Sequence, residues 1–208
     1  MATRWCWLSL LPAAGGLALL QPTEMPPVLN SPVYSLATLN ADGSTNMQIL
    51  TYATPVGVSP RTWAISLYRP TLTRDNWAAR RRGVLQLLCT PHAPLVYALG
   101  GRSGRDDDKA AACAAAGFGW VEPPASGGAS AEAEEPRLLP GCATYLRLVQ
   151  LGELTPCGEH DVAICQVEGM LAPPEEGDGP SMGDALSSAR LRELGIITDR
   201  GKAVEPDS

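Results

Sequence analysis

Positively charged and hydroxyl side chains gather in one stretch of this sequence, residues 61–82. The stretch holds six arginines and one acidic residue, so its formal charge is +5 (six minus one) in a chain of net charge −6. Guanidinium groups and hydroxyls bind phosphate oxygens, and a helix that begins near Thr73 would add its N-terminal dipole. The candidate ligands of an anionic group are Arg69, Thr71 and Thr73, with Ser66 beside them. The three arginines at the end of the stretch are interpreted instead as solvated helix-surface residues.

Small polar residues just before this stretch favour a second kind of contact. Asn46 and Thr51 flank an apolar run, and Ala53-Thr54-Pro55 exposes backbone next to a small side chain. A flat heteroaromatic ring edged with carbonyls and nitrogens is best recognised by backbone amides and short hydroxyls, because bulky side chains block its approach. The alternative is that the threonines reflect only the ordinary strand preference of this residue.

Several other catalytic and binding motifs are missing from the sequence. It has no nucleophile elbow G-x-S-x-G, no P-loop and no G-x-G-x-x-G dinucleotide fingerprint. None of its six cysteines has C-x-x-C spacing and neither histidine neighbours a cysteine, so no zinc site is predicted. Cys89 and Cys165 lie in apolar runs and are expected to be buried, reduced thiols. Of the histidines, His92 is expected to be exposed in a loop, and His160 to be a polar hairpin residue.

Length and composition indicate one globular domain. The chain has 208 residues, of which 45% are hydrophobic and 18% charged. The acidic net charge argues against a surface that coats nucleic acid, and 40 glycines and prolines (21 + 19) favour short elements and many turns. Residues 1–24 are set apart as a leader, a short membrane anchor spanning residues 5–20, or a mis-assigned start before Met25.

The elements that must position the polar residues are mostly strands. Alternating patterns predict strands at 33–39, 47–54 and 62–68, linked by an Asn40–Gly43 hairpin turn, with Pro55 ending the second. Thr73 is predicted to cap a short helix that Gly83 ends, and a further strand follows at 84–89. Hairpin-linked strands at this spacing predict an antiparallel sheet or barrel with peripheral helices.

The second half of the chain continues the same pattern. A helix is predicted to start at the three aspartates 106–108 and to run to Ala116, and another to begin at 94–99. Residues 121–136 are predicted to be an exposed loop. Long strands are expected at 141–154 and 161–170, followed by an acidic linker at 173–180 and a terminal helix at 187–195.

The order of several segments resembles the flavin reductase-like proteins of the FMN-binding split-barrel superfamily. The resemblance covers roughly residues 28–170 in collinear order. The matching segments are Pro32-Val33-Tyr34, Asp42-Gly43 with Asn46, Thr51–Pro55, Trp63–Leu67, Thr73 with Asn76, Leu99–Lys109, Gly117–Trp120, Leu139–Leu148, and Gly158-x-His160 with Val162–Val167.

The resemblance implies a fold and a cofactor. It implies an antiparallel split β-barrel over residues 25–172, with residues 173–208 as linker and tail, and usually a homodimer. It further implies one non-covalently bound FMN per protomer, reduced by NADH or NADPH. By position, ring and ribityl contacts would fall on Thr38, Asn46, Thr51, Ala53 and Thr54, phosphate contacts on Ser66, Arg69, Thr71 and Thr73, and His160 would lie near the flavin.

The sequence departs from the family pattern in one segment. Many members carry a His-Arg-Gly-Arg type segment late in the chain, where this sequence has Ser187–Arg192 without a histidine. A non-catalytic flavin-binding or flavin-sensing protein is therefore the alternative function, and a haem-binding or ligand-free relative is a third. No nucleic-acid partner is expected. The expected location is the cytoplasm, or an organelle if residues 1–24 are a transit peptide. The roles of Asp106 and Lys109, which match a family signature, stay open.

Overall fold

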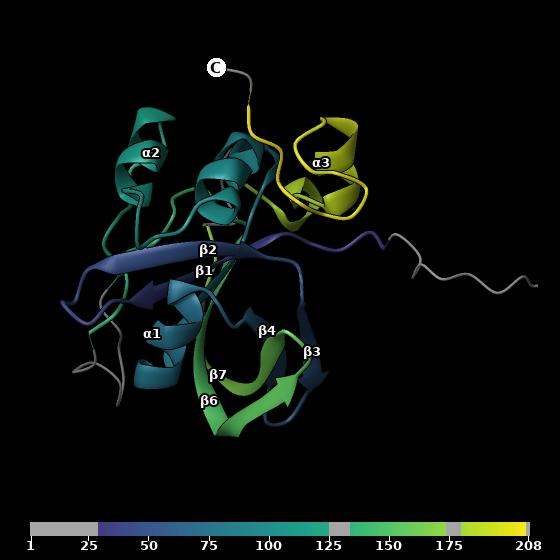
Figure 1. Cartoon of the computed structure of the whole chain (residues 1–208). Helices are drawn as coiled ribbons and strands as arrows, with labels where there is room; N and C mark the ends of the chain where they lie inside the picture. The colour runs from purple at the N-terminus through teal and green to yellow at the C-terminus, as the bar shows by residue number, and fades with distance from the viewer. Residues whose placement is uncertain (1–28, 125–133, 174–179, 207–208) are drawn as a thin grey trace, which may run out of the picture.

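Seven antiparallel strands form one curved sheet with short helices around it (Figure 1). The computed structural model describes residues 29–124, 134–173 and 180–206. The predicted leader, most of the predicted loop at 121–136 and most of the acidic linker lie outside these residues. No helix within the described ranges is both long and apolar enough to cross a membrane.

The strands pair in the order β2-β1-β5-β6-β7-β4-β3. Their bounds are β1 Tyr34–Leu39, β2 Thr45–Leu50, β3 Ala53–Gly57, β4 Thr62–Tyr68, β5 Arg82–Leu87, β6 Thr144–Cys157 and β7 His160–Leu171. The two edge strands, β2 and β3, follow each other in the chain and are separated only by Thr51 and Tyr52. The sheet thus curls until its two edge strands are adjacent in the chain, although they are not hydrogen-bonded to each other. This arrangement confirms the predicted split barrel.

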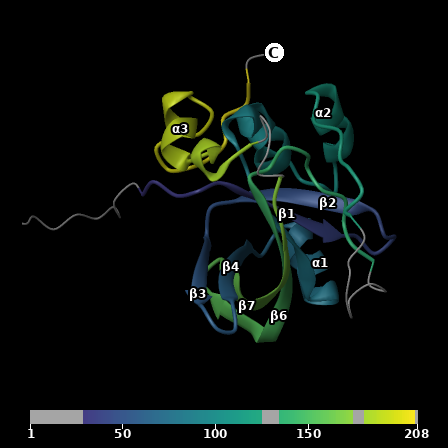
Figure 2. The same cartoon turned by 180° about the vertical axis from the view of Figure 1, so that it is seen from behind.

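Helical segments cover the two sides of β1 and β2 (Figures 1 and 2). Helix α1 (Leu72–Arg80) lies on the barrel side, and α2 (Lys109–Ala115) and α3 (Ser188–Glu193) lie on the other side. Shorter turns are η1 (Thr90–Leu95), η2 (Tyr97–Gly101) and η3 (Met182–Asp184). Helices α2 and α3 start within the ranges expected for them, and their caps are Asp108, which accepts from the backbone N–H of Ala111, and Ser187, which accepts from that of Arg190.

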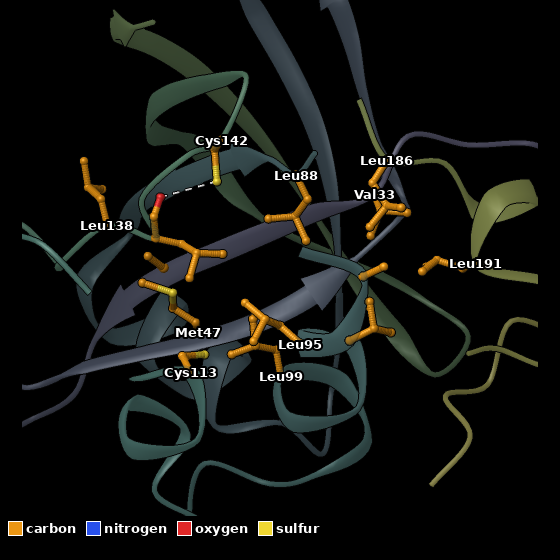
Figure 3. Close-up of a cluster of buried hydrophobic side chains, with 14 of the residues drawn as sticks. Val33, Met47, Leu88, Leu95, Leu99, Cys113, Leu138, Cys142, Leu186 and Leu191 are labelled. Carbon is orange, nitrogen blue, oxygen red and sulfur yellow. Dashed lines mark hydrogen bonds between the residues drawn. The ribbon is translucent and has the colours of Figure 1, made fainter. Parts of the chain in front are cut away.

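The sheet separates two hydrophobic cores, so β1 is buried along its whole length. Tyr34 and Leu36 face the barrel interior with Ile65, Leu67 and Trp77. Alternate residues face the other core, because successive side chains of a strand point to opposite faces. Figure 3 shows this second core, in which Val33 lies beside Leu186 of the C-terminal segment. Cys89 and Cys165 are buried and free, as expected.

Besides the N-cap of α1 and the exposure of His92, which are described below, four predictions about local structure were wrong. The strand expected at 47–54 is two strands, since the chain leaves the β1 edge at Thr51 and joins β4, where the Ser66 N–H bonds the Tyr52 carbonyl at 2.9 Å. Pro55 lies within β3, which is tolerated because β3 is an edge strand. The helix expected at 94–99 is a 3₁₀ turn followed by a π turn.

The fourth difference concerns the end of α1. The helix was expected to end at Gly83. Its left-handed C-cap is instead Arg81, with φ of 57°. Gly83 is instead the second residue of β5. A Cβ there would lie 2.6 Å from the Ala37 carbonyl oxygen, so the glycine permits close approach of β1.

Candidate functional site

A cavity of about 220 Å³ opens at the N-terminus of α1, and we call it the helix cavity. It gathers residues from β2, β4, α1, the 99–104 segment and the start of α2. Its lining consists of Asn46, Gln48, Tyr68, Pro70, Thr71, Leu72, Thr73, Leu99, Gly100, Arg102, Ser103, Gly104 and Lys109. Three predicted site residues, Asn46, Thr71 and Thr73, meet here.

The first turn of α1 offers unpaired donors to this cavity. The cap is Thr71 and not the predicted Thr73: its Oγ1 accepts from the Arg74 N–H at 3.3 Å and donates to the Tyr68 carbonyl at 2.7 Å. The backbone N–H groups of Leu72 and Thr73 have no partner among the described residues. Free N–H groups and the helix dipole make such a terminus a site for an anion.

Asn46 ties the two walls of the helix cavity together. It is only 4% exposed, and its Nδ2 donates to Thr73 Oγ1 at 2.8 Å. Its Oδ1 lies against Gly104, where a Cβ would come within 2.2 Å. Asn46 thus holds α1 against the glycine-rich segment.

Arginines and aspartates form a chain of ion pairs that links the β4–α1 junction to β7 and to Arg105. Asp161, the second residue of β7, is buried and accepts from Arg69 at 2.9 Å and from Arg74 at 2.7 Å. Both guanidinium groups hold the pKa of this carboxyl below its usual value. Asp75 pairs with Arg105, whose Nη1 also reaches the Pro70 carbonyl. Arg69 therefore braces the β4–α1 junction and does not line the helix cavity.

A second cavity, of about 460 Å³, lies on the outer face of β4 and β7, and we call it the strand cavity. The residues that line it are Asn30, Ser31, Pro32, Thr51, Tyr52, Ala53, Thr54, Ala64, Ser66 and Val162. Four predicted residues, Thr51, Ala53, Thr54 and Ser66, therefore come together. Ser66 lies with the predicted ring contacts and not with the helix cavity.

Three aromatic rings connect the two cavities. Tyr68 lines the helix cavity and Tyr52 the strand cavity. The ring of His160 lies between them, with its centroid 5.1 Å from that of Tyr68 and 6.0 Å from that of Tyr52. His160 is thus placed beside the predicted ring contacts by its pairing with Tyr68 across β7 and β4.

Two further residues lie away from the places that the sequence suggested. Thr38 is fully buried and accepts from Asn76 Nδ2 at 3.2 Å, so it anchors α1 to β1 and lines neither cavity. His92, expected in solvent, is 1% exposed. Its Nδ1 accepts from the Cys89 N–H at 3.0 Å and its Nε2 donates to the Pro140 carbonyl at 2.9 Å.

Residue patterns alone assign neither Lys109 nor Arg102 to a site. Both line the helix cavity, and both belong to the G-G-R-S-G-R-D-D-D-K segment. The signal was present, because cations flank closely spaced glycines that permit backbone to approach a ligand. Among the described residues, no group of three or more His, Cys, Asp or Glu side chains is placed to hold a metal ion.

The fold is shared with several solved proteins of low sequence identity. A flavoredoxin from Methanosarcina acetivorans superposes with a TM-score of 0.67 at 13% identity, covering 91% of this chain and 92% of that one. An FMN-binding protein from Thermus thermophilus gives 0.60 at 20% identity, covering 81% and 87%. An NADH:FAD oxidoreductase from Streptomyces globisporus C-1027 gives 0.57 at 14% identity, covering 70% and 78%.

The sequence itself identifies the family. A search of curated protein sequences found no match. The family model for the flavin reductase like domain, however, matches residues 28–186, which is most of the chain and includes both cavities. The protein therefore belongs to the family defined by the flavin reductase like domain.

Proposed function

We propose that this protein is an FMN-binding oxidoreductase of flavin reductase type, which transfers hydride from NADH or NADPH to flavin. The observation that carries the proposal is the pair of cavities joined by the three aromatic rings. An anion site at a helix N-terminus adjoins a second site lined by short hydroxyls, as an elongated molecule with a phosphate at one end requires.

The residues of the helix cavity fit a phosphate group. The free N–H groups of Leu72 and Thr73 and the cation Arg102 would hold its oxygens. The strand cavity offers Thr51, Thr54 and Ser66 as short donors and acceptors for a ring system. When bound, FMN supplies a ring that accepts hydride. The contribution of the chain is to bind and orient that ring, since no side-chain acid or base is required for this transfer.

The related proteins support this proposal at different levels. The family model supports a flavin reductase, one neighbour is described as FMN-binding and another as an NADH:FAD oxidoreductase. We favour FMN over FAD as the cofactor, because the helix cavity beside the strand cavity offers donors for a single phosphate group.

We further propose that the protein is a homodimer, as the family resemblance implies. Thr54, Ala64, Ile164 and Leu151 pair across four strands and form a row on the sheet face opposite the buried Ile65 and Ala163. Ile164 and Leu151 are 39% and 40% exposed. A second copy would cover this apolar row next to the strand cavity.

Anaerobic titration of the FMN-loaded protein with NADH and NADPH tests the proposed function. We expect the absorption of oxidised flavin to disappear with one equivalent of the preferred nicotinamide. A protein that binds FMN but stays coloured after the addition of NADH or NADPH would favour the non-catalytic alternative. That alternative is motivated by the absence of a histidine from Ser187–Arg192. A colourless protein that takes up no flavin would contradict both functions.

A further inference from the structure

Lys109 is a buried cation that has no carboxylate partner in the part of the chain that the structure describes. Only 6% of the residue is exposed, although lysine is almost never fully buried unless it is paired. Its Nζ donates to the Leu99 carbonyl at 2.8 Å and to the Met47 carbonyl at 3.0 Å. Among the described residues it forms no ion pair. The buried ammonium is therefore stabilised by only two neutral carbonyl groups. A bound anion would offset the free energy that is lost when this charge is removed from water.

The larger cavity that Lys109 also lines carries the carboxylates of Asp107, Asp108, Glu122, Glu134 and Glu135, but no ion pair among the described residues includes Lys109. The 102–108 segment contributes Asp107 and α2 contributes Cys113, whereas β2 and η2 contribute carbonyl groups. Asp107 is itself engaged by Arg102 at 2.9 Å. Burial lowers the pKa of Lys109 to about 8, against the opposing influence of Cys113 and Asp107. Its charge is thus sensitive to any anion that arrives nearby.

Lys109 stands where such an anion would arrive. Together with Asn46 and Gly104 it forms a wall shared by the helix cavity and a larger neighbouring cavity of about 600 Å³. The free N–H groups of α1 belong to residues that line the same helix cavity. Two independent features, a helix N-terminus and a buried ammonium, therefore meet at one cavity.

We propose that Lys109 is the charge partner of the flavin phosphate and that, in alkaline solution, the nucleotide binds with uptake of a proton at Lys109. This inference rests on the proposed function, because it assumes that a flavin nucleotide occupies the helix cavity. It gives the signature lysine a role beyond holding two carbonyl groups.

The direction of the pH effect follows from linkage. A phosphate monoester is a dianion above about pH 7, so the charge of the ligand no longer changes there. The bound phosphate favours the charged lysine, and affinity is lost as pH rises through the pKa of the free protein. About one tenth of Lys109 is charged at pH 9, so FMN should bind roughly tenfold more weakly there than at pH 7.

Fluorescence titrations with FMN and riboflavin at pH 7, 8 and 9 test the inference in the wild type. Riboflavin lacks the phosphate, so its affinity should not follow the charge of Lys109. We expect the affinity for FMN to fall and that for riboflavin to stay level. Calorimetry at pH 8 to 9 in buffers of different ionisation enthalpy should show proton uptake with FMN alone.

Two substitutions separate charge from hydrogen bonding. Lys109→Gln keeps a donor amide for the two carbonyls but removes the charge, and Lys109→Met removes both. Lys109→Gln should bind FMN about tenfold more weakly at pH 7, with no further loss at pH 9, and bind riboflavin like the wild type. Lys202→Gln changes the other lysine of the chain, which is exposed, and is the matched control.

The outcomes distinguish this inference from the proposed function. If the wild type binds FMN with the same affinity from pH 7 to 9, the flavin site stands and the role of Lys109 is overturned. The same holds if Lys109→Gln binds FMN like the wild type. If neither FMN nor riboflavin binds at any pH, the proposed function and the role of Lys109 are both overturned.

Discussion

The two histidines of this chain have opposite surroundings. His160 lies between two tyrosine rings beside the strand cavity. His92 is enclosed by the Cys89 N–H, the Pro140 carbonyl and the ring of Phe118, whose centroid is 4.8 Å away. One nitrogen of His92 accepts and the other donates, so the structure holds the neutral imidazole in one tautomer.

Stability should therefore depend on His92 in mildly acidic solution. Burial lowers the pKa of His92 below its ordinary value of 6.5, so the unfolded chain takes up the proton first. We expect the free energy of unfolding to fall as pH drops below 6.5, and His92→Gln to lose this dependence. That variant should also be about 1–3 kcal/mol less stable at pH 7, because its bonds to Cys89 and Pro140 are disturbed.

Urea unfolding at pH 7, 6 and 5 measures the effect. His160→Gln, which changes the other histidine, is the control and should keep the dependence of the wild type. A slope that vanishes in His160→Gln and persists in His92→Gln would refute the assignment.

Residue types were predictable from the sequence, but the partner of each residue was not. Threonines and arginines near 66–73 indicated an anion site, and Thr71 and Thr73 do line the helix cavity. Arg69 looked equally suitable, yet Asp161, 92 positions later, engages it. His92 follows a proline in an expected loop, and only tertiary packing buries it. Such pairings depend on contacts between distant segments, which local patterns do not encode.

Among the elements, the contact between β2 and the 99–104 segment shapes the helix cavity. Gly104→Ala should displace Asn46, because the new Cβ would lie 2.2 Å from its Oδ1. The bond from Asn46 to Thr73 would be strained, and we expect FMN to bind more than tenfold more weakly while the fold persists. Gly119→Ala, whose Cβ would meet nothing within 4 Å, is the control. Equal FMN affinities of the two variants, by fluorescence titration, would contradict this role of Gly104.

Helix α3 anchors the C-terminal segment to the second core. Leu191 is 1% exposed in that core, whereas Leu194 in the same turn is 43% exposed. Leu191→Ala should lower the free energy of unfolding by about 2–5 kcal/mol, and Leu194→Ala should change it by less than about 0.5 kcal/mol. Denaturant unfolding of both variants checks this. Similar losses in both would show that α3 is not packed as described.

Strand boundaries were less predictable than strand existence. The alternation over 47–54 is continuous in sequence, so nothing local marks the break at Thr51 and Tyr52. The break arises because β2 and β3 pair with different strands, β1 and β4. The starts of α2 and α3, by contrast, agree with the starts expected at 106–108 and 187, because a capping side chain bonds backbone only three residues away.

At the scale of the whole molecule, one apolar row on the outer sheet face is available to a second copy. Ile164→Glu places a charge in that row, so the protein should become monomeric if the row is the dimer contact. Light scattering with size exclusion measures this. Met182→Glu, at a 65% exposed methionine in η3, is the control and should leave the mass unchanged. A monomeric wild type, or a dimeric Ile164→Glu variant, would contradict the proposed interface.

The pairing of β7 with β4 has a consequence for how both cavities are specified. Asp161 pairs with Leu67 and points to the buried side, where it engages Arg69 and Arg74, whereas His160 pairs with Tyr68 on the outer face. Because strand side chains alternate, a slip of one position would exchange the two environments. Asp161 would then lose its ion pairs with the two arginines, and His160 would lose its ring contacts with the two tyrosines. A register slip between β7 and β4 would therefore disrupt both ends of the site together.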